Sequence, residues 1–330
     1  MNIDMHAHLA PREFVEEIKR GVNRWKMEFR GGKDDPDAIY VDGRFLPFPR
    51  AFYDIDARLV EMSSMGVDHQ VISAVPLLLF YDRDRRLGHA MAQMTNEAIA
   101  EAVRTHPGQF TAMASLPMQD TALALEELSR ACGDLGMGAI EIGASAGDRE
   151  LDHPDLEPFW AEVERRDLPV FIHPIKPPAR ERLDDFYLFN LIGFLTETTM
   201  ATARLIFGGV LDRHPNLRIV LAHGGGQIIF TQGRFDHGRQ YIRQAQGTSA
   251  EPLSAYLPRL YYDSITYDPK ALRYISEVVG TDRIFLGTDH PFGIAERDPV
   301  SFIDRVPGLD EEARDAIKGQ NAARLFGISA

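Results

Sequence analysis

We predict an α/β fold, a (β/α)8 barrel formed as a single unit over residues 1–330. Short β-like runs alternate with longer amphipathic segments along almost the whole chain. Several of the short runs, such as residues 218–222, are nearly continuous in apolar residues, as parallel strands buried on both faces should be. No Gly-x-Gly-x-x-Gly motif follows the first run, which counts against a doubly wound dinucleotide-binding sheet. The repeated alternation therefore favours a closed barrel.

The predicted elements follow one another in a regular order. The strands are expected at residues 2–9, 67–75, 110–116, 137–142, 168–173, 217–223, 260–264 and 283–288. Helices are expected at residues 91–105, 121–135, 156–166, 199–213 and 269–279, where apolar side chains recur at helical spacing.

Two long connections interrupt this alternation. Residues 10–56 are rich in Gly, Pro, Asp and aromatic residues, and long loops of this kind are usually functional. We interpret this segment as a small inserted subdomain that folds over the barrel mouth. A second connection, residues 174–198, is expected to form another wall of the same pocket.

The composition limits the classes of partner. A formal net charge of −13 argues against a nucleic-acid-binding protein, which would need a basic face. No apolar run approaches the roughly 20 residues of a membrane span. Cys132 is the single cysteine, so no disulfide forms within the chain, which is typical of a reducing compartment. With no secretory signal at the N-terminus, we expect a cytoplasmic protein.

Two histidines in the first predicted strand, His6 and His8, are the first candidates for chemistry. Side chains at positions i and i+2 of a strand point to the same face, roughly 7 Å apart along the strand. Two imidazoles so placed can bind one metal ion. Asp4 shares this face one layer lower, where an orienting or packing role is expected rather than metal ligation.

Three further residues end predicted strands, where barrel enzymes place their chemistry. They are His173, His223 and Asp289. Histidines at the ends of three separate strands, with an aspartate at the end of a fourth, predict a metal site at this face of the barrel. The remaining histidines of helical and loop segments are expected on the surface: His89, His106, His153, His214 and His237.

These motifs resemble those of the amidohydrolase superfamily, and most closely its decarboxylase branch, typified by 2-amino-3-carboxymuconate-6-semialdehyde decarboxylase. The resemblance rests on Asp4-Met5-His6-Ala7-His8, Phe171-Ile172-His173-Pro174, Leu221-Ala222-His223-Gly224-Gly225-Gly226 and Gly287-Thr288-Asp289-His290-Pro291-Phe292. It extends over nearly the whole chain, including Gly66-Val67-Asp68 and Asn321-Ala322-Ala323-Arg324-Leu325-Phe326.

The resemblance implies a mononuclear site. His6, His8, His173 and Asp289 would bind one divalent ion, with a water completing the shell, and His223 would be the nearby acid/base. Zn²⁺ suits this ligand set best, although Mn²⁺, Fe²⁺ or Co²⁺ also bind imidazole and carboxylate. No organic cofactor is required. The predicted fourth strand carries Glu141 instead of a metal-bridging lysine, as a partner of the ligands or as a solvated carboxylate.

The resemblance also implies two substrate-binding arginines. Arg44, in the inserted segment, resembles the arginine that holds the substrate carboxylate, with Arg50 as the alternative. Arg234 matches an arginine that reaches in from a neighbouring subunit, which implies a homodimer. An arginine can bind a carboxylate through two parallel hydrogen bonds.

The chain also departs from the branch at several positions. His290 replaces a tyrosine, Asn190 stands near the place of a pocket tryptophan, and Lys176 follows the His173-Pro174 motif, either contacting an acidic substrate or simply exposed. These departures suggest a different carboxylated substrate.

We therefore predict a metal-dependent, non-oxidative decarboxylase of an aromatic or muconate-semialdehyde-like acid, in which Arg44 and Arg234 bind the substrate while His223 and Asp289 manage protons. The main alternative is a hydrolase or hydratase that uses the same metal site, with hydroxide attacking a carbonyl or an alkene. A barrel that has lost catalysis and serves as a binding scaffold is the third interpretation, which the retention of all five site residues disfavours.

Overall fold

The computed structural model describes residues 1–31, 37–41 and 44–329, apart from the side chain of Arg44. Its centre is an eight-stranded sheet in which every pair of adjacent strands is parallel. The strands in spatial order are β1 (Ile3–Leu9), β5 (His69–Ala74), β6 (Phe110–Ser115), β7 (Ala139–Gly143), β8 (Pro169–His173), β9 (Arg218–Leu221), β10 (Tyr261–Asp263) and β11 (Ile284–Phe285). The predicted barrel is confirmed.

The barrel closes between its first and last strands. Met5 N donates to Leu286 O at 2.9 Å, and His8 N donates to His290 O at 2.8 Å. Asp289 N donates to His6 O at 2.9 Å. The backbone that follows β11 thus runs beside β1 and brings Asp289 next to the two histidines.

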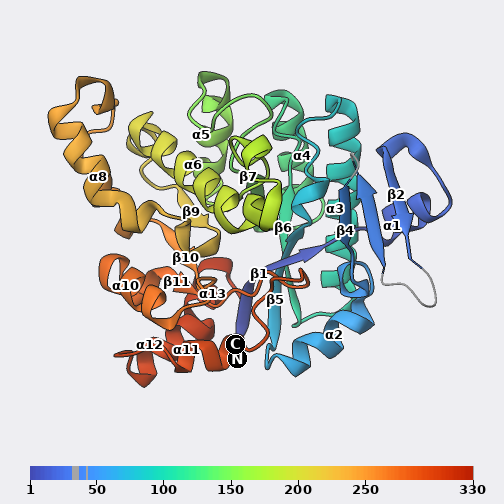
Figure 1. Cartoon of the computed structure of the whole chain (residues 1–330). Coiled ribbons are helices and arrows are strands. Elements are labelled where there is room, and N and C mark those ends of the chain that lie inside the picture. The colour runs from blue at the N-terminus through green and yellow to red at the C-terminus, as the bar shows by residue number, and fades with distance from the viewer. Residues whose placement is uncertain (32–36, 42–43, 330) are drawn as a thin grey trace.

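Helices surround the sheet on its outer face (Figure 1). They are α2 (Ile55–Ser64), α3 (Arg85–Thr105), α4 (Thr121–Gly133), α5 (Glu157–Arg165), α6 (Leu195–Phe207), α7 (Val210–Arg213), α8 (Ile228–Tyr241), α9 (Leu253–Tyr256), α10 (Pro269–Val279), α11 (Pro299–Asp304), α12 (Glu311–Asp315) and α13 (Asn321–Phe326). No helix in the described part of the chain is both long and apolar enough to cross a membrane.

Apolar side chains fill the space on both sides of the strands. One cluster, which includes Met5, Val71, Phe171 and Phe285, is contributed mainly by alternate strand residues and fills the inside of the barrel. A larger cluster packs the strands against the helices. Because both faces are buried, the strands read as nearly continuous apolar runs in the sequence.

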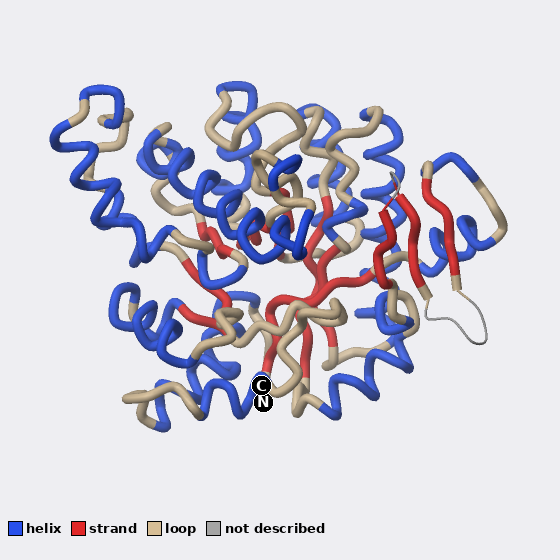
Figure 2. Tube along the Cα trace, viewed as in Figure 1, coloured by secondary structure: helices blue, strands red, loops and turns tan. Residues whose placement is uncertain are grey.

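The first long connection forms its own elements beside the barrel. It contains α1 (Arg12–Lys19) and a three-stranded antiparallel sheet of β2 (Met27–Arg30), β3 (Ala38–Val41) and β4 (Arg44–Pro47) (Figure 2). An apolar cluster that includes Phe14, Trp25 and Phe52 packs this region. The role of residues 10–56 as a subdomain over the barrel mouth stays a prediction.

Several predicted boundaries were wrong. The helix expected at 199–213 is divided into α6 and α7, because Gly209 adopts a left-handed φ of 70°. The strand expected at 283–288 is only two residues long, and the helix expected at 91–105 begins at Arg85. His214 is not a surface residue: it is buried, with ring nitrogens 2.9 Å from Glu157 Oε1 and 3.2 Å from Glu164 Oε2.

Candidate metal centre and active site

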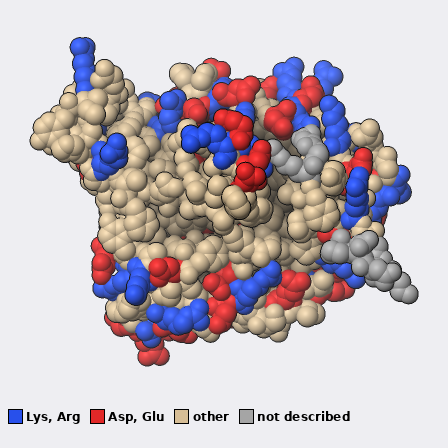
Figure 3. Space-filling view, in the orientation of Figure 1, with Lys and Arg blue, Asp and Glu red and all other residues tan. Residues whose placement is uncertain are grey.

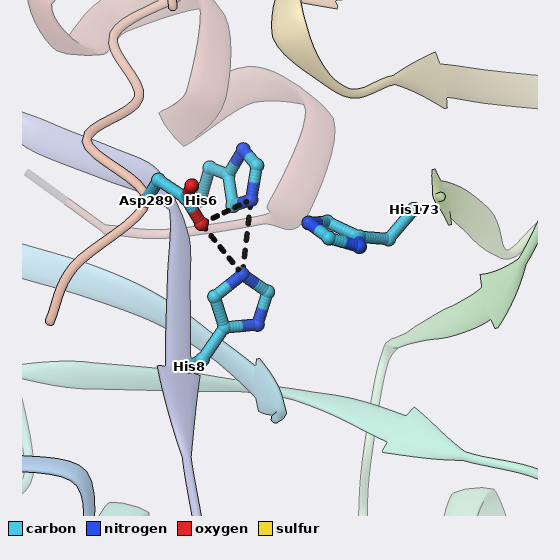
Figure 4. Close-up of side chains that lie close together, drawn as sticks. All are labelled: His6, His8, His173 and Asp289. Atoms are coloured by element: carbon cyan, nitrogen blue, oxygen red, sulfur yellow. Dashed lines mark hydrogen bonds and ion pairs between the residues drawn. The ribbon is translucent and has the colours of Figure 1, made fainter. Parts of the chain in front are cut away.

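Four side chains from three places in the sequence meet at the carboxyl end of the barrel. His6 and His8 project from β1, His173 ends β8, and Asp289 follows β11 (Figure 4). All four are buried, and each offers one ligand atom within 4.8 Å of the others. The structure therefore brings together the four residues that the sequence singled out.

Hydrogen bonds fix the tautomer of each imidazole, because each Nδ1 lies next to an oxygen that can only accept. The distances are 2.7 Å from His6 Nδ1 to Asp263 Oδ2, 2.8 Å from His8 Nδ1 to Ala74 O, and 2.8 Å from His173 Nδ1 to Pro174 O. Each Nδ1 must then carry a proton, so that each ring, when neutral, presents a lone pair at Nε2.

These lone pairs face one another. Nε2 of His6 lies 3.0 Å from Nε2 of His8, and Asp289 Oδ1 lies 3.4 Å and 3.2 Å from these two atoms. His173 Nε2 has no hydrogen-bond partner among the described residues. Lone pairs at such distances repel unless a cation lies between them. Three imidazole nitrogens and one carboxylate oxygen are suitable donors for a divalent transition metal ion, so the residues fit such an ion.

The surroundings of His6 favour positive charge at the centre of the cluster, where a proton on His6 or a bound cation could supply it. Burial disfavours the charged form of His6, but hydrogen bonds to Asp263 and Asp289 outweigh it and raise the pKa of His6 to about 10. Burial would raise the pKa of Asp289, yet its contacts with His223, His6 and His8 hold it well below its usual range. The cluster thus stabilises positive charge beside an ionised carboxylate.

His223 lies next to this cluster but outside the four-residue group. It follows β9 in a turn, where its φ of 56° is left-handed, and its Nε2 lies 3.7 Å from Asp289 Oδ2. The side chain is 10% exposed and lines two cavities. This position suits a group that exchanges a proton with a bound molecule.

The glycines after His223 allow the tight turn. Gly225 and Gly226 have φ values of 77° and 66°. A Cβ on Gly226 would lie 2.3 Å from the backbone oxygen of Leu195 in α6. Only glycine permits α6 to pack this closely behind His223.

The sequence analysis missed Asp263, which is completely buried at the end of β10. Besides accepting from His6, its carboxylate accepts from the backbone N–H groups of His223 at 2.8 Å and Gly224 at 2.8 Å. The signal was available, because a carboxylate that ends a predicted strand is the criterion that identified Asp289.

A buried polar network lies behind the cluster. Asp4 accepts from His6 N at 3.0 Å, from Thr288 Oγ1 at 2.6 Å and from Gln70 Nε2 at 2.9 Å. Arg58 donates to Gln70 Oε1 at 2.7 Å and to the carbonyl oxygen of His8. Asp4 thus has the expected orienting position.

Glu141 and His290 take positions that the sequence left open. Glu141 is not solvated: it is fully buried 3.8 Å from His8 Nδ1, and burial raises its pKa to about 8. His290 is turned toward Glu61 at 2.9 Å and Arg58 at 3.4 Å, and it lines neither cavity beside the cluster. The presence of His290 where the branch has a tyrosine therefore does not by itself indicate a different substrate.

A cavity of about 890 Å³ opens onto His173, His223 and Asp289. Its walls are mainly apolar and aromatic, and the aromatic residues among them are Phe45, Phe80, Tyr81, Tyr187, Phe189, Phe194 and Phe292. Both long connections contribute to the walls, as expected for residues 174–198. Figure 3 shows a hollow at the centre of this face, surrounded mostly by uncharged residues.

A second cavity, of about 220 Å³, is also lined by His223 and by Asp289 of the cluster. It lies between η7 (Phe189–Phe194), α8 and α10, and its lining includes Phe230 and Tyr267. Asn190 lines both cavities, so this departure from the branch lies at the surface that a molecule in either cavity would contact.

Neither Arg50 nor Arg234, two of the arginines predicted to bind the substrate, is found among the residues that line the two cavities. The side chain of Arg44 lies outside the described residues. Arg50 is exposed, pairs with Asp54 at 2.6 Å and is not among the described residues that line the large cavity, and the choice between Arg44 and Arg50 stays a prediction. Arg234 is exposed on α8 and lines neither cavity. Lys176 lines the large cavity and pairs with Asp148 at 3.1 Å.

Comparison with known proteins agrees with the fold. The amidohydrolase family model matches residues 3–328. The chain is 32% identical over 332 residues to a 2-amino-3-carboxymuconate-6-semialdehyde decarboxylase from Dictyostelium discoideum, covering 99% of this chain and 92% of that protein. It is 32% identical over 285 residues to a gamma-resorcylate decarboxylase from Rhizobium sp., covering 82% and 86%.

A solved structure has the same fold. A dihydroxybenzoic acid decarboxylase from Polaromonas sp., with bound manganese and the inhibitor 2-nitroresorcinol, matches with a TM-score of 0.79 at 23% identity, covering 99% of this chain and 96% of that one. The chain belongs to the amidohydrolase family, in the branch whose named relatives are decarboxylases of carboxylic acids.

Proposed function

We propose that the protein is a metal-dependent, non-oxidative decarboxylase of an aromatic or muconate-semialdehyde-like carboxylic acid. The observation that carries the proposal is the cluster of His6, His8, His173 and Asp289 beside His223, at the edge of an aromatic-lined cavity. The decarboxylases among the relatives support the same class of reaction.

The four clustered residues would hold one divalent ion, which would polarise a substrate oxygen when bound. We keep Zn²⁺ as the proposed ion, with Mn²⁺, Fe²⁺ and Co²⁺ as alternatives, and the Polaromonas structure with manganese supports a divalent ion of this class. The buried hydrogen bonds from Nδ1 keep each ligand ring oriented toward the ion.

Decarboxylation breaks the bond between the carboxylate and its carbon and replaces it with a C–H bond. The electron pair passes into the conjugated system of the substrate, so no organic cofactor is required. His223 can deliver the proton to that carbon, because it lines both cavities and its Nε2 lies 3.7 Å from Oδ2 of Asp289. Asp289 thus supports the proton transfer as well as binding the ion.

The substrate carboxylate needs a cationic partner. We propose Arg44 for this role, because the neighbouring β4 residues Phe45, Leu46 and Pro47 line the large cavity. The segment of residues 10–56 would then cover the barrel mouth and carry the arginine to the substrate.

We also propose a homodimer in which Arg234 completes the partner's site. Phe230, one turn before Arg234 on α8, is 56% exposed and lines the smaller cavity. In Figure 1, α8 lies at the outer edge of the molecule, where it is accessible to a second copy. Tyr241 and Ile242 at the end of this helix are also exposed apolar residues.

A reducing cytoplasm remains the expected location, supported by the single cysteine.

The test is to measure CO₂ release from a panel of hydroxybenzoic and muconate-type acids by protein loaded with Zn²⁺ or Mn²⁺. We expect release from at least one acid, its loss after chelation, and its return with added metal. Release from none of them, together with hydrolysis of an amide or lactone or hydration of an alkene, would contradict the proposal and favour the hydrolase or hydratase alternative.

A further inference from the structure

Asp263 is a buried carboxylate that contacts two functional residues of the site at once, the side chain of His6 and the backbone of His223. Its side chain is fully buried at the end of β10. Its Oδ2 accepts from His6 Nδ1 at 2.7 Å and from His223 N at 2.8 Å. Its Oδ1 accepts from Gly224 N at 2.8 Å and from Ile265 N at 3.0 Å.

The two bonds to Oδ2 have different consequences. The bond to His6 fixes the proton on Nδ1 and turns Nε2 toward the metal cluster. The bond from the His223 backbone N–H fixes the main chain of His223, and through it the direction of the His223 ring. A change at this one oxygen must therefore disturb both the metal ligand and the acid/base.

The turn at His223 needs this support. His223 and Gly224 have φ values of 56° and 61°, and for a residue with a Cβ the left-handed region costs about 1–2 kcal/mol. Successive N–H groups in such a turn form a concave anion site, which the Asp263 carboxylate occupies. Without the carboxylate, His223 can relax toward the ordinary regions of backbone space, which would move its ring away from the substrate.

We infer that Asp263 is a positioning residue that couples the His6 metal ligand to the proton-transferring His223 through one carboxylate oxygen. This inference rests on the proposed function for the role of His223. Asp263 itself lines neither cavity, so it acts through the two histidines and not on the substrate.

The test uses Asp263→Asn in the full-length protein. An asparagine has one acceptor oxygen, and its NH₂ group can accept neither from His6 and His223, at the place of Oδ2, nor from Gly224 and Ile265, at the place of Oδ1. In either orientation, part of the support for the His223 turn is lost. We expect metal affinity to fall roughly 10- to 100-fold. With metal kept saturating, we expect kcat to remain at least about 10-fold lower because the placement of His223 is still lost, while KM changes little.

A double-variant comparison separates coupling from a structural role. In a His223→Ala background at saturating metal, Asp263→Asn should have no further effect on kcat, because the side chain that it positions is already gone. With Co²⁺ bound, the visible spectrum should change in Asp263→Asn and stay unchanged in His223→Ala. A kcat that returns to the wild-type value at saturating metal, or effects that multiply in the double variant, would overturn the inference.

Two controls keep the result clear. Asp310→Asn removes a carboxylate that only caps α12, through Ala313 N at 2.8 Å, and should leave metal affinity and kcat unchanged. If Asp263→Asn does not fold, Asp263→Glu provides the same comparison, because it keeps the charge but displaces both oxygens. The affinity and spectral measurements need no substrate, so they remain valid even if no acid is decarboxylated and the proposed function fails.

Discussion

At the scale of single residues, the positions of a few protons define the site. The Nδ1 atoms of His6, His8 and His173 all face acceptors, which leaves their Nε2 atoms for a cation. His223 differs, because its Nδ1 has no partner within the described part of the protein and its Nε2 lies near Asp289. Under the proposed function, three of the four imidazoles would therefore be metal ligands and His223 would exchange a proton with the substrate.

We predict that His223→Ala keeps the metal but lowers kcat by roughly 10²- to 10⁴-fold, the usual loss when a general acid or base is removed. His173→Ala, by contrast, should lose metal affinity, because it removes a ring from the cluster. Metal content by elemental analysis and CO₂ release together distinguish the two effects. Loss of metal from His223→Ala would show that His223 is a ligand instead.

The sequence was sufficient to predict this cluster but not its surroundings. His6, His8, His173, His223 and Asp289 could be found because strand ends of a parallel barrel meet at one face. Asp263 ends β10 and so carries the same signal, but the sequence does not show that its carboxylate turns toward His6, 257 positions away. The choice between Arg44 and Arg50 stayed open for a similar reason, since the partners of both depend on how the inserted segment folds; Arg50 pairs with Asp54.

At the scale of elements, α6 holds the chain segment that follows β8. Glu197 of α6 is 5% exposed, and its Oε2 accepts from Ile175 N at 2.8 Å and from Lys176 N at 2.7 Å. These bonds fix the start of the 174–198 connection just after His173. Burial raises the pKa of Glu197 from 4.5 to about 7, against the opposing effect of the two N–H groups.

This raised pKa predicts a pH-dependent stability. The folded state binds the proton more tightly than the unfolded state, so the contribution of Glu197 to the free energy of unfolding is largest below pH 4.5 and is lost as the pH rises through about 7. Glu197→Gln stays neutral and its amide oxygen can still accept. We expect the variant to be more stable than the wild type at pH 8 by up to about 3 kcal/mol, with the gain shrinking toward pH 5.

Urea unfolding of the metal-free proteins at several pH values measures this difference. Parallel curves for the variant and the wild type, with no change in their separation between pH 5 and 8, would contradict the assignment. The metal-free form avoids confusion with loss of the ion at low pH.

The order of the elements was predictable, but several helices, α2 and α8 among them, and the small sheet were not. Apolar periodicity identified the strands because both of their faces are buried. It failed for α8, whose buried residues in this structure are confined to Ile228 and Ile229, so no apolar stripe marks the helix. It also failed for α2 and for the β2–β4 sheet, which has the short strands and turns of an irregular insertion.

At the scale of the whole molecule, the proposed dimer predicts complementation between two defective subunits. Arg234→Ala and His223→Ala should each have little activity. In a mixed dimer, one site combines an intact His223 with Arg234 from the partner and is fully formed. Since half of randomly reassorted dimers are mixed, about a quarter of the wild-type activity should return.

The measurement is to refold or co-express the two variants in equal amounts and compare the mixture with each variant alone. Unmixed samples of the same total concentration are the control. A mixture no more active than the mean of its components would contradict the shared site, and a monomer in analytical ultracentrifugation would exclude it.

Closure of the barrel has a further consequence. His6 and His8 stand on one side of the join between the first and last strands, and Asp289 stands on the other. An ion bound by all three would link the first strand of the barrel to the backbone that follows the last strand, and so stabilise the closure. Chelation should therefore accelerate deuterium uptake first at the amides of Met5, His8 and Asp289, while the ladder between β6 and β7 stays protected.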